Sequence, residues 1–291
     1  TTNAPWLAIT SGDSGTTNGT VVFGAAANAG TARTGAVIVA GGGRSRTCTV
    51  VQAGGNMTNW YAATNGNDSA AGTNWATAKL TIQAAVDVAA ASDTVWASNG
   101  VYVGLVTVNK GVTVKSMNGP EVTTIQGANS RCVTLSNALA VVSGFTLTGG
   151  RADWGGGAYI VAGALEGCII RDNTATGRID VDPLYPNYHS TLTYGGGVLG
   201  GTLRDCRLIH NTASSSDNAR HGYTIANGGG AYQALLINCL VSSNAAFSYN
   251  NDFPGGAEAR GGGTWGGTNE NCPLVKNSAT AGTISVGGAA F

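Results

Sequence analysis

Short apolar stretches recur through the second half of the chain, and each lies between a glycine triplet and an asparagine. They read GGGAYIVAGALEGCIIRDN, GGGVLGGTLRDCRLIHN, GGGAYQALLINCLVSSN and GGGTWGGTNENCPLVKN, starting at Gly155, Gly195, Gly228 and Gly261. The starts are 40, 33 and 33 residues apart. The apolar runs are too short for helices, and a period of this size marks a repeat architecture. The pattern predicts an all-β solenoid, a parallel β-helix with one coil per repeat and coils about 4.8 Å apart.

One cysteine and one asparagine occupy fixed places in each repeat. They are Cys168, Cys206, Cys239 and Cys272, each followed after five residues by Asn173, Asn211, Asn244 and Asn277. In stacked coils, equivalent positions lie above one another. We therefore expect a buried thiol column, continued upstream by Phe145 and Val112, and an asparagine ladder at a turn, where asparagine tolerates the left-handed backbone. Disulfides between coils are conceivable, but parallel Cβ atoms are poorly aimed for them, which favours free thiols. With no C-x-x-C motif, we expect no metal and no cofactor.

A helical pattern precedes the repeats. Apolar side chains at Ile82, Ala85, Val86, Ala89 and Ala90 follow a spacing of three and four residues, which predicts an amphipathic helix of about three turns. Thr81 is the expected N-cap. We expect this helix to cover the open end of the first coil, which begins with the strand DTVWASNG.

The opening segment YAATNGNDSAAGTNWATAKLTIQAAVDVAAASDTVWASNGVY resembles the start of secreted right-handed parallel β-helix proteins. The GGGAY…CxxxxN coils are similar to the repeats of polymorphic outer-membrane proteins. The resemblance covers residues 59–291 and implies a right-handed β-helix that is secreted, extracellular or on a bacterial cell surface. It does not settle activity, because lyases, adhesins and structural proteins share this fold.

The first 55 residues have a different pattern, with the predicted strands TVVFGAAA, TGAVIVAG and RTCTVVQA separated by turn residues. The entry WLxIxSG and the exit TVxQAG resemble the back half of a BACON-like immunoglobulin-type domain. The expected organisation is a partial immunoglobulin-like module at 1–55, a linker with capping helix and first strand at 56–100, and the β-helix at 101–291.

Apolar residues at both ends of the chain suggest an assembly surface. The partial module has few strands to cover its apolar side chains, and the final coil carries no polar cap. We expect head-to-tail contacts between copies of this chain, giving a homopolymer; the alternative is truncation. The residues expected in these contacts are Trp6, Leu7, Ile9, Ile284, Val286 and Phe291.

Composition limits the classes of partner that we expect for this chain. The chain has 15 basic and 15 acidic residues, and 10% of its 291 residues are charged. This balance gives no reason to expect nucleic acid as a partner, and no apolar run reaches the roughly 18 residues of a membrane span. The first residues, TTNAPW, are typical of a mature secreted chain.

Long segments at 174–194, 212–227 and 245–260 separate each asparagine from the next glycine triplet, and we expect them to be loops that share one corner of the solenoid. Aromatic and polar residues there predict one patch for sugar stacking or a protein interface; the alternative is packing on the solenoid flank. The candidate residues are Tyr185, Tyr188, His189, Arg220, His221, Tyr223, Tyr249 and Phe253.

The residues point to a non-enzymatic role, and no catalytic residue is assigned. Asp180 and Asp182 are close in sequence, but no carboxylate cluster with calcium-ligand spacing is present. The predicted function is an extracellular structural or fibre subunit with adhesive properties. The alternative is a secreted β-helix that binds carbohydrate or cleaves it, as a polysaccharide lyase or glycoside hydrolase.

Overall fold

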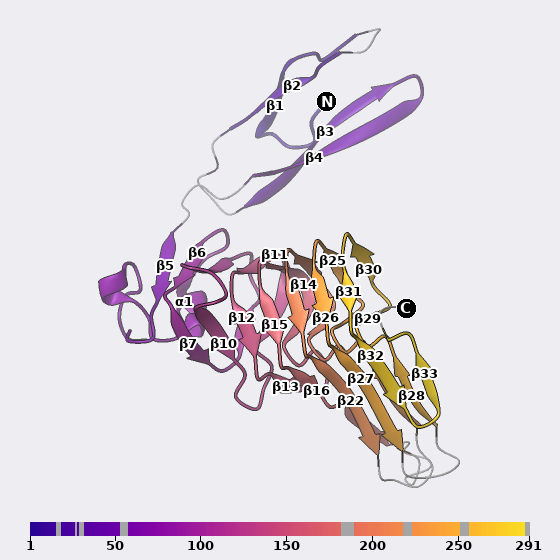
Figure 1. Ribbon diagram of the computed structural model, residues 1–291. Helices are drawn as coiled ribbons and strands as arrows, with labels where there is room; N and C mark the ends of the chain where they lie inside the picture. The colour runs from indigo at the N-terminus through magenta and orange to yellow at the C-terminus, as the bar shows by residue number, and fades with distance from the viewer. Residues whose placement is uncertain are drawn as a thin grey trace. The chain divides into compact units, whose positions relative to one another are not determined.

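A computed structural model describes residues 1–15, 19–26, 28, 32–52, 58–181, 189–217, 223–250 and 256–288 (Figure 1). The chain falls into two compact units: residues 1–58 with 90–93, and residues 59–89 with 94–291. The corresponding boundary expected from the sequence is at residue 55.

Four strands form two antiparallel pairs in the first unit. They are β1 (Leu7–Ser11) with β2 (Val22–Ala25), and β3 (Arg33–Gly41) with β4 (Arg44–Gln52). Gly42 and Gly43, at φ of 57° and 74°, make the turn between β3 and β4, which needs a left-handed backbone. Leu7 is buried, Ile9 is half-buried, and the Arg33 guanidinium lies 4.5 Å from the ring centroid of half-buried Trp6.

The second unit is a parallel β-helix, which confirms the predicted fold class. One side is a seven-stranded parallel sheet: β7 (Gly100–Val103), β10 (Thr123–Gln126), β12 (Thr146–Thr148), β15 (Ile169–Arg171), β21 (Arg207–Ile209), β26 (Leu240–Ser242) and β31 (Leu274–Val275). The next side is a twelve-stranded sheet: β5 (Asn59–Ala62), β6 (Thr94–Ala97), β9 (Thr113–Ser116), β11 (Val133–Ser143), β14 (Ala158–Glu166), β19 (Val198–Leu199), β24 (Ala231–Tyr232) and β29 (Thr264–Trp265), flanked by β8 (Val106–Val108), β20 (Thr202–Arg204), β25 (Leu235–Ile237) and β30 (Thr268–Glu270). β5 therefore extends the solenoid sheet into the segment expected to be a linker.

Large apolar side chains fill the solenoid interior. Six strands of the twelve-stranded sheet, β6, β9, β11, β14, β20 and β25, each contribute one inward residue to a column along the coils: Val95, Val114, Val142, Leu165, Leu203 and Leu236, all at most 1% exposed. Burying each side chain contributes about 1.5–3 kcal/mol, so this stack contributes strongly to solenoid stability.

Two short helices lie at the start of the solenoid, η1 (Trp75–Thr77) and α1 (Ile82–Val88). The Thr81 hydroxyl oxygen accepts a hydrogen bond from the Ala84 backbone N–H at 3.1 Å, as expected for an N-cap. Ile82, Ala85 and Val86 pack into the solenoid core. The helix is shorter than predicted, because the chain is already extended at Ala89 and the Ala90 N–H bonds instead to the Asp93 carboxylate.

The cysteines and asparagines form two interior columns. Cys168, Cys206 and Cys239 are buried, Cys272 is half-buried, and all four are free thiols. The asparagine carboxamides bond from coil to coil at 2.9–3.0 Å, with Asn173 donating to Asn211, Asn211 to Asn244, and Asn244 to Asn277.

The left-handed residue at the asparagine corner is not the asparagine itself. The positive φ falls on the preceding residues, Asp172, His210, Ser243 and Lys276, at 54–56°. The prediction that the asparagines adopt the left-handed backbone is therefore wrong. Each asparagine points inward instead, and its carboxamide bonds to the asparagine of a neighbouring coil.

The described parts of the segments expected to be loops instead form strands of two further sheets. The outgoing sheet contains β13 (Arg151–Ala152), β16 (Thr174–Ala175), β22 (Thr212–Asp217), β27 (Ala245–Asn250) and β32 (Ser278–Ala281). The returning sheet contains β17 (Arg178–Val181), β18 (His189–Tyr194), β23 (Tyr223–Asn227), β28 (Ala257–Arg260) and β33 (Ile284–Val286), all parallel except the β17–β18 pair. The two sheets face each other and extend from the coils (Figure 1); we call this pair the lateral sandwich.

Small residues fill the lateral sandwich. Its apolar cluster consists of Ala213, Ala226, Ala246 and Ala259, with Ala279 and Ala281 beside it. Buried hydroxyls bond across it: Ser215 Oγ donates to the Thr191 carbonyl oxygen at 2.7 Å, and Ser248 Oγ to that of Thr224 at 2.8 Å. Stacking of equivalent short segments thus builds a second interior from residues that individually look like loop residues.

Candidate binding groove

Two residues of the predicted loop patch, Tyr223 and Tyr249, lie on different faces of the lateral sandwich. Thr224 and Ser248 bond to each other across the lateral sandwich at 2.9 Å. Their neighbours Tyr223 and Tyr249, 58% and 47% exposed, therefore lie on its two opposite outer faces. His189 begins β18, and nothing is described of its side chain. The other patch residues, Tyr185, Tyr188, Arg220, His221 and Phe253, lie outside the described residues.

Among the expected assembly residues of the last coil, Ile284 is 45% exposed and Val286 is half-buried on β33. Phe291 lies outside the described residues.

An aromatic column runs along the outer face of the twelve-stranded sheet. Register places Tyr159, Leu199, Tyr232 and Trp265 beside one another on β14, β19, β24 and β29. The residue before each of them is buried, so alternation along the strand turns these four outward. Each is the second residue after a glycine triplet, so each of these four coils places one aromatic ring or one leucine side chain at this position.

The glycine triplets bring a second set of rings close to this column. A Cβ on Gly196 would lie 2.4 Å from the Gly229 carbonyl oxygen of the next coil, so the stacked triplets leave no room for side chains. Trp154 and Tyr194 directly precede the first two triplets. Their ring centroids are 6.2 Å apart, and Tyr194 is in turn 4.6 Å from Tyr232.

These rings surround an open groove of about 570 Å³. The Trp154 indole N–H donates to the Leu192 carbonyl oxygen at 2.9 Å, which fixes the orientation of that ring. The groove is lined by Trp154, Tyr159, Ile160, Val161, Tyr194, Leu199, Gly200, Gly201, Tyr232 and Gln233. The side chains of all four aromatic residues are half-buried, so the rings are held by packing while part of each surface is open.

The groove exists because adjacent coils differ in length. Four residues of β14, 160–163, stand opposite only Gly200 and Gly201 of the next coil. Ile160 turns inward over these glycines, and a Cβ on Gly201 would lie 2.2 Å from its side chain. The coil between the Tyr159 and Tyr232 coils therefore contributes only Leu199 and bare backbone to the groove floor.

The groove is uncharged along its lining. None of the ten described lining residues is Asp, Glu, His, Lys or Arg, so its polar atoms are tyrosine hydroxyls, the Gln233 carboxamide and the bonded indole N–H. Burial, followed by the neighbouring Tyr232, raises the pKa of the Tyr194 phenol, which keeps it neutral. A charged group lies beside the lining without belonging to it: the Arg131 guanidinium stacks 5.1 Å from the Tyr159 ring centroid.

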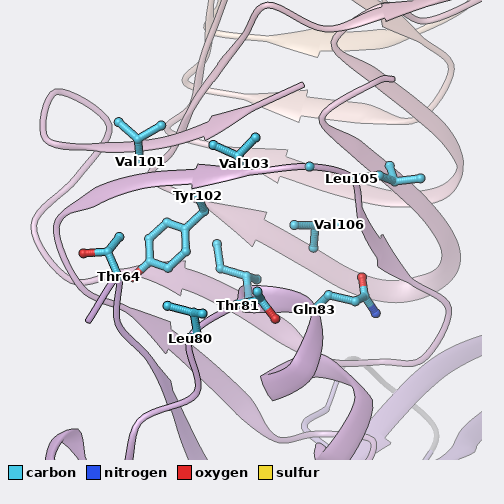
Figure 2. Close-up of a pocket in the computed structure, with 11 residues that line it drawn as sticks. Thr64, Leu80, Thr81, Gln83, Val101, Tyr102, Val103, Leu105 and Val106 are labelled. Carbon is cyan, nitrogen blue, oxygen red and sulfur yellow. The ribbon is translucent and has the colours of Figure 1, made fainter. Parts of the chain in front are cut away.

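A second cavity, of about 240 Å³, lies where the start of α1 meets β7 (Figure 2). Two of its polar side chains, Tyr102 and Gln83, are bonded within the protein. The Tyr102 hydroxyl donates to the Ala62 carbonyl oxygen at 3.0 Å, and the Gln83 carboxamide accepts from the Thr107 N–H at 2.7 Å. Its rim is formed by exposed Leu80, Val101, Val103 and Leu105. These contacts join the capping helix to the first coils and leave few polar groups for a ligand.

Within the described ranges, no group of three or more His, Cys, Asp or Glu side chains could hold a metal ion. No helix in the described part of the chain is long and apolar enough to cross a membrane.

The chain matches no protein-family model, and no curated protein is significantly similar to it. The fold and the groove geometry therefore carry the functional argument.

Proposed function

We propose that this protein is a non-catalytic, extracellular β-helix that binds neutral carbohydrate through the aromatic groove. The observation that carries the proposal is the set of four half-buried rings, Trp154, Tyr159, Tyr194 and Tyr232, around an uncharged hollow. Aromatic rings offer apolar faces to the C–H face of a sugar, and phenol hydroxyls bond to its edge.

The chemistry of the lining favours binding over cleavage. Glycoside hydrolysis requires two carboxyl groups flanking the bond, and the ten lining residues provide none. Lyase chemistry requires a base and a group that neutralises a uronate, whereas the polar atoms here are neutral. The groove is thus suited to retaining a sugar without reacting with it.

The solenoid is suited to hold the rings of the groove in fixed positions. Its asparagine ladder, from Asn173 to Asn277, and its apolar columns link the coils that carry the rings, which gives a rigid platform for them. The low charge content is in keeping with an extracellular location.

Binding to an array of neutral and acidic glycans tests the proposal, with affinity for any hit measured by calorimetry. Tyr232→Ala and Tyr159→Ala should each weaken retention by about tenfold or more, since an aromatic contact contributes about 1–3 kcal/mol in comparable stacking. Tyr249→Ala, an exposed tyrosine on the lateral sandwich, is the matched control and should bind normally. Equal loss in the control, or no glycan binding by the intact chain, would contradict the proposal.

A second candidate function is self-assembly through the first unit. Phe23, Val39 and Val51 are 37%, 51% and 55% exposed there, which leaves apolar area for a second copy to cover. Electron microscopy and sedimentation of the intact chain test this idea. Filaments that disappear in a Phe23→Ser, Val39→Thr, Val51→Thr variant support it, and a monomer that persists at high concentration excludes it.

A further inference from the structure

One end of the groove is closed by three rings. Trp154, Tyr194 and Tyr232 form a continuous arc, with ring centroids 6.2 Å and 4.6 Å apart in succession. Tyr194 and Tyr232 come from successive coils, so their contact spans the step between coils at this end. A glycan chain cannot pass between rings that touch.

The floor opposite this arc is open. Gly200 and Gly201 follow Leu199 along the floor and carry no side chains. Both have positive φ, 75° and 74°, and a Cβ at either position would meet Ile160, so this part of the floor remains bare backbone. A slot closed at one end and open at the other accepts the end of a glycan, whose remaining residues leave over these glycines.

Gln233, which lines the slot, has a left-handed backbone, as do other non-glycine residues of the coils such as Asp205 and Asn238. Register along the coils places it beside Gly200 and Gly266, which follow Leu199 and Trp265 as Gln233 follows Tyr232. All three have a left-handed backbone, with φ of 75° for Gly200, 50° for Gln233 and 64° for Gly266. Glycine adopts this conformation freely, whereas a side chain makes it costly.

The Gln233 carboxamide does not stabilise the fold through a hydrogen bond to any described residue. Its side chain is exposed and lines the groove. Among the three aligned positions, Gly200, Gln233 and Gly266, Gln233 is the one that carries a side chain, and that side chain lines the groove. A carboxamide has both donors and an acceptor, which is the combination that adjacent sugar hydroxyls require.

From these observations we infer that the groove recognises the terminal residue of a neutral glycan and that Gln233 is the specificity-determining residue that reads its hydroxyls. This inference rests on the proposed carbohydrate function and names its ligand more narrowly. The rings provide stacking that any sugar can use, and Gln233 provides the directional contact that distinguishes one hydroxyl arrangement from another.

The terminal-residue part is tested with an array of neutral oligosaccharides that share one core and end in glucose, galactose, mannose or fucose. Binding should sort by the terminal residue and should be lost when that residue is removed. Equal binding to every member with the same core would mean that the groove holds an internal segment, and would overturn the inference.

The Gln233 part is tested with Gln233→Gly on the best-binding member of that array. Glycine relieves the left-handed strain, so the melting temperature should stay unchanged or rise by about 2 °C. Affinity should nevertheless fall about tenfold, and the preference among termini should flatten, because directional hydrogen bonds are lost. A merely structural glutamine would instead give a lower melting temperature and unchanged preference, which would overturn its assigned role.

Two further variants complete the design. Gln233→Asn keeps a carboxamide and a residue that tolerates the left-handed backbone, but shortens the side chain, so it should fold normally and bind weakly. Ser243→Gly makes the equivalent backbone change at φ of 56° away from the groove lining and should leave binding unaltered. If Tyr232→Ala abolishes binding while Gln233→Gly does not alter it, the proposed function stands and the role of Gln233 falls.

Discussion

The two interiors of the second unit are built on the same coils but from different residues. The solenoid is filled by Leu, Ile, Val, Phe and Cys side chains, and its inward positions are almost fully buried. The lateral sandwich has an all-alanine apolar cluster, with Ser and Thr hydroxyls buried beside it. Strand register is nevertheless maintained from coil to coil in both, as in β21–β26 and β22–β27.

The comparison shows that stacking can maintain a strand pair with little apolar area. In the sandwich, backbone ladders and bonds such as Ser215 Oγ to the Thr191 carbonyl oxygen replace large apolar contacts. Small side chains also allow close approach of the two sheets, so added volume matters more there. Solenoid stability should depend on apolar volume, and sandwich stability on small size and hydroxyl bonding.

The largest expected difference comes from removing apolar volume. Leu203→Ala should lower the free energy of unfolding by about 3 kcal/mol, because a fully buried side chain is lost and a cavity remains. Ala213→Gly, the nearest equivalent in the sandwich, should cost about 1 kcal/mol, mainly through backbone entropy. Denaturant unfolding followed by circular dichroism measures both, and equal losses would mean that the two interiors do not differ in this way.

Adding volume should be costly inside the lateral sandwich. Ala226→Leu in the sandwich should destabilise by about 2 kcal/mol, because three extra carbons must fit between closely packed sheets. Ile225→Leu, at a half-buried position of the same strand, is the matched control and should alter the melting temperature little. If Ala226→Leu is tolerated as well as this control, the sandwich is more loosely packed than its alanines indicate.

Much of the solenoid can be predicted from the sequence because a repeat converts spacing into position. Identical residues at equal intervals must lie above one another, which is why Asn211 could be expected beside Asn244. The lateral sandwich could not be predicted from the sequence. Its strands TASSSD and AAFSYN lack the alternation of large apolar residues that marks a buried strand. Its strands are stabilised by copies in neighbouring coils, a property that no single segment carries.

Part of the groove could be predicted from the sequence. Tyr159, Tyr232 and Trp265 share one place after the glycine triplets, and alternation alone turns them outward. From the triplet start to the cysteine is 13 residues in the first repeat, 155 to 168, but 11 in the next, 195 to 206, which signals the extra residues of β14. The left-handed Gln233 could not be predicted, because the corner geometry of the neighbouring coils sets it.

A single added hydroxyl should separate the two interiors more finely. Val241→Thr changes shape little but places a hydroxyl in the solenoid core, at a cost of about 1.5 kcal/mol if it finds no acceptor. Ala246→Ser adds the same group to the sandwich, where Ser248 already bonds to a carbonyl, and should cost less than about 0.5 kcal/mol. Melting temperatures of the two variants give the comparison directly, and a larger loss for Ala246→Ser would contradict it.

The smallest expected effect uses pH to probe the solenoid interior alone, through Cys132. Burial raises the pKa of this thiol from its ordinary value of 9.0 to about 12, and its Sγ lies 3.4 Å from the Thr148 carbonyl oxygen. The folded state keeps the proton over a range in which the unfolded chain releases it. Its stability contribution is therefore complete below pH 9 and declines as the pH rises from about 9 towards about 12.

Between pH 8 and pH 9.5 this thiol should account for a loss of about 1 kcal/mol in the free energy of unfolding. Cys132→Ala should reduce that loss by the same amount, whatever its cost at neutral pH. The measurement is denaturant unfolding at both pH values, with Ala246→Ser as the control that keeps the full dependence, since the sandwich strands contain no cysteine. Equal pH dependence in Cys132→Ala and the control would show that water reaches this thiol, and that the solenoid interior is less dry than its packing implies.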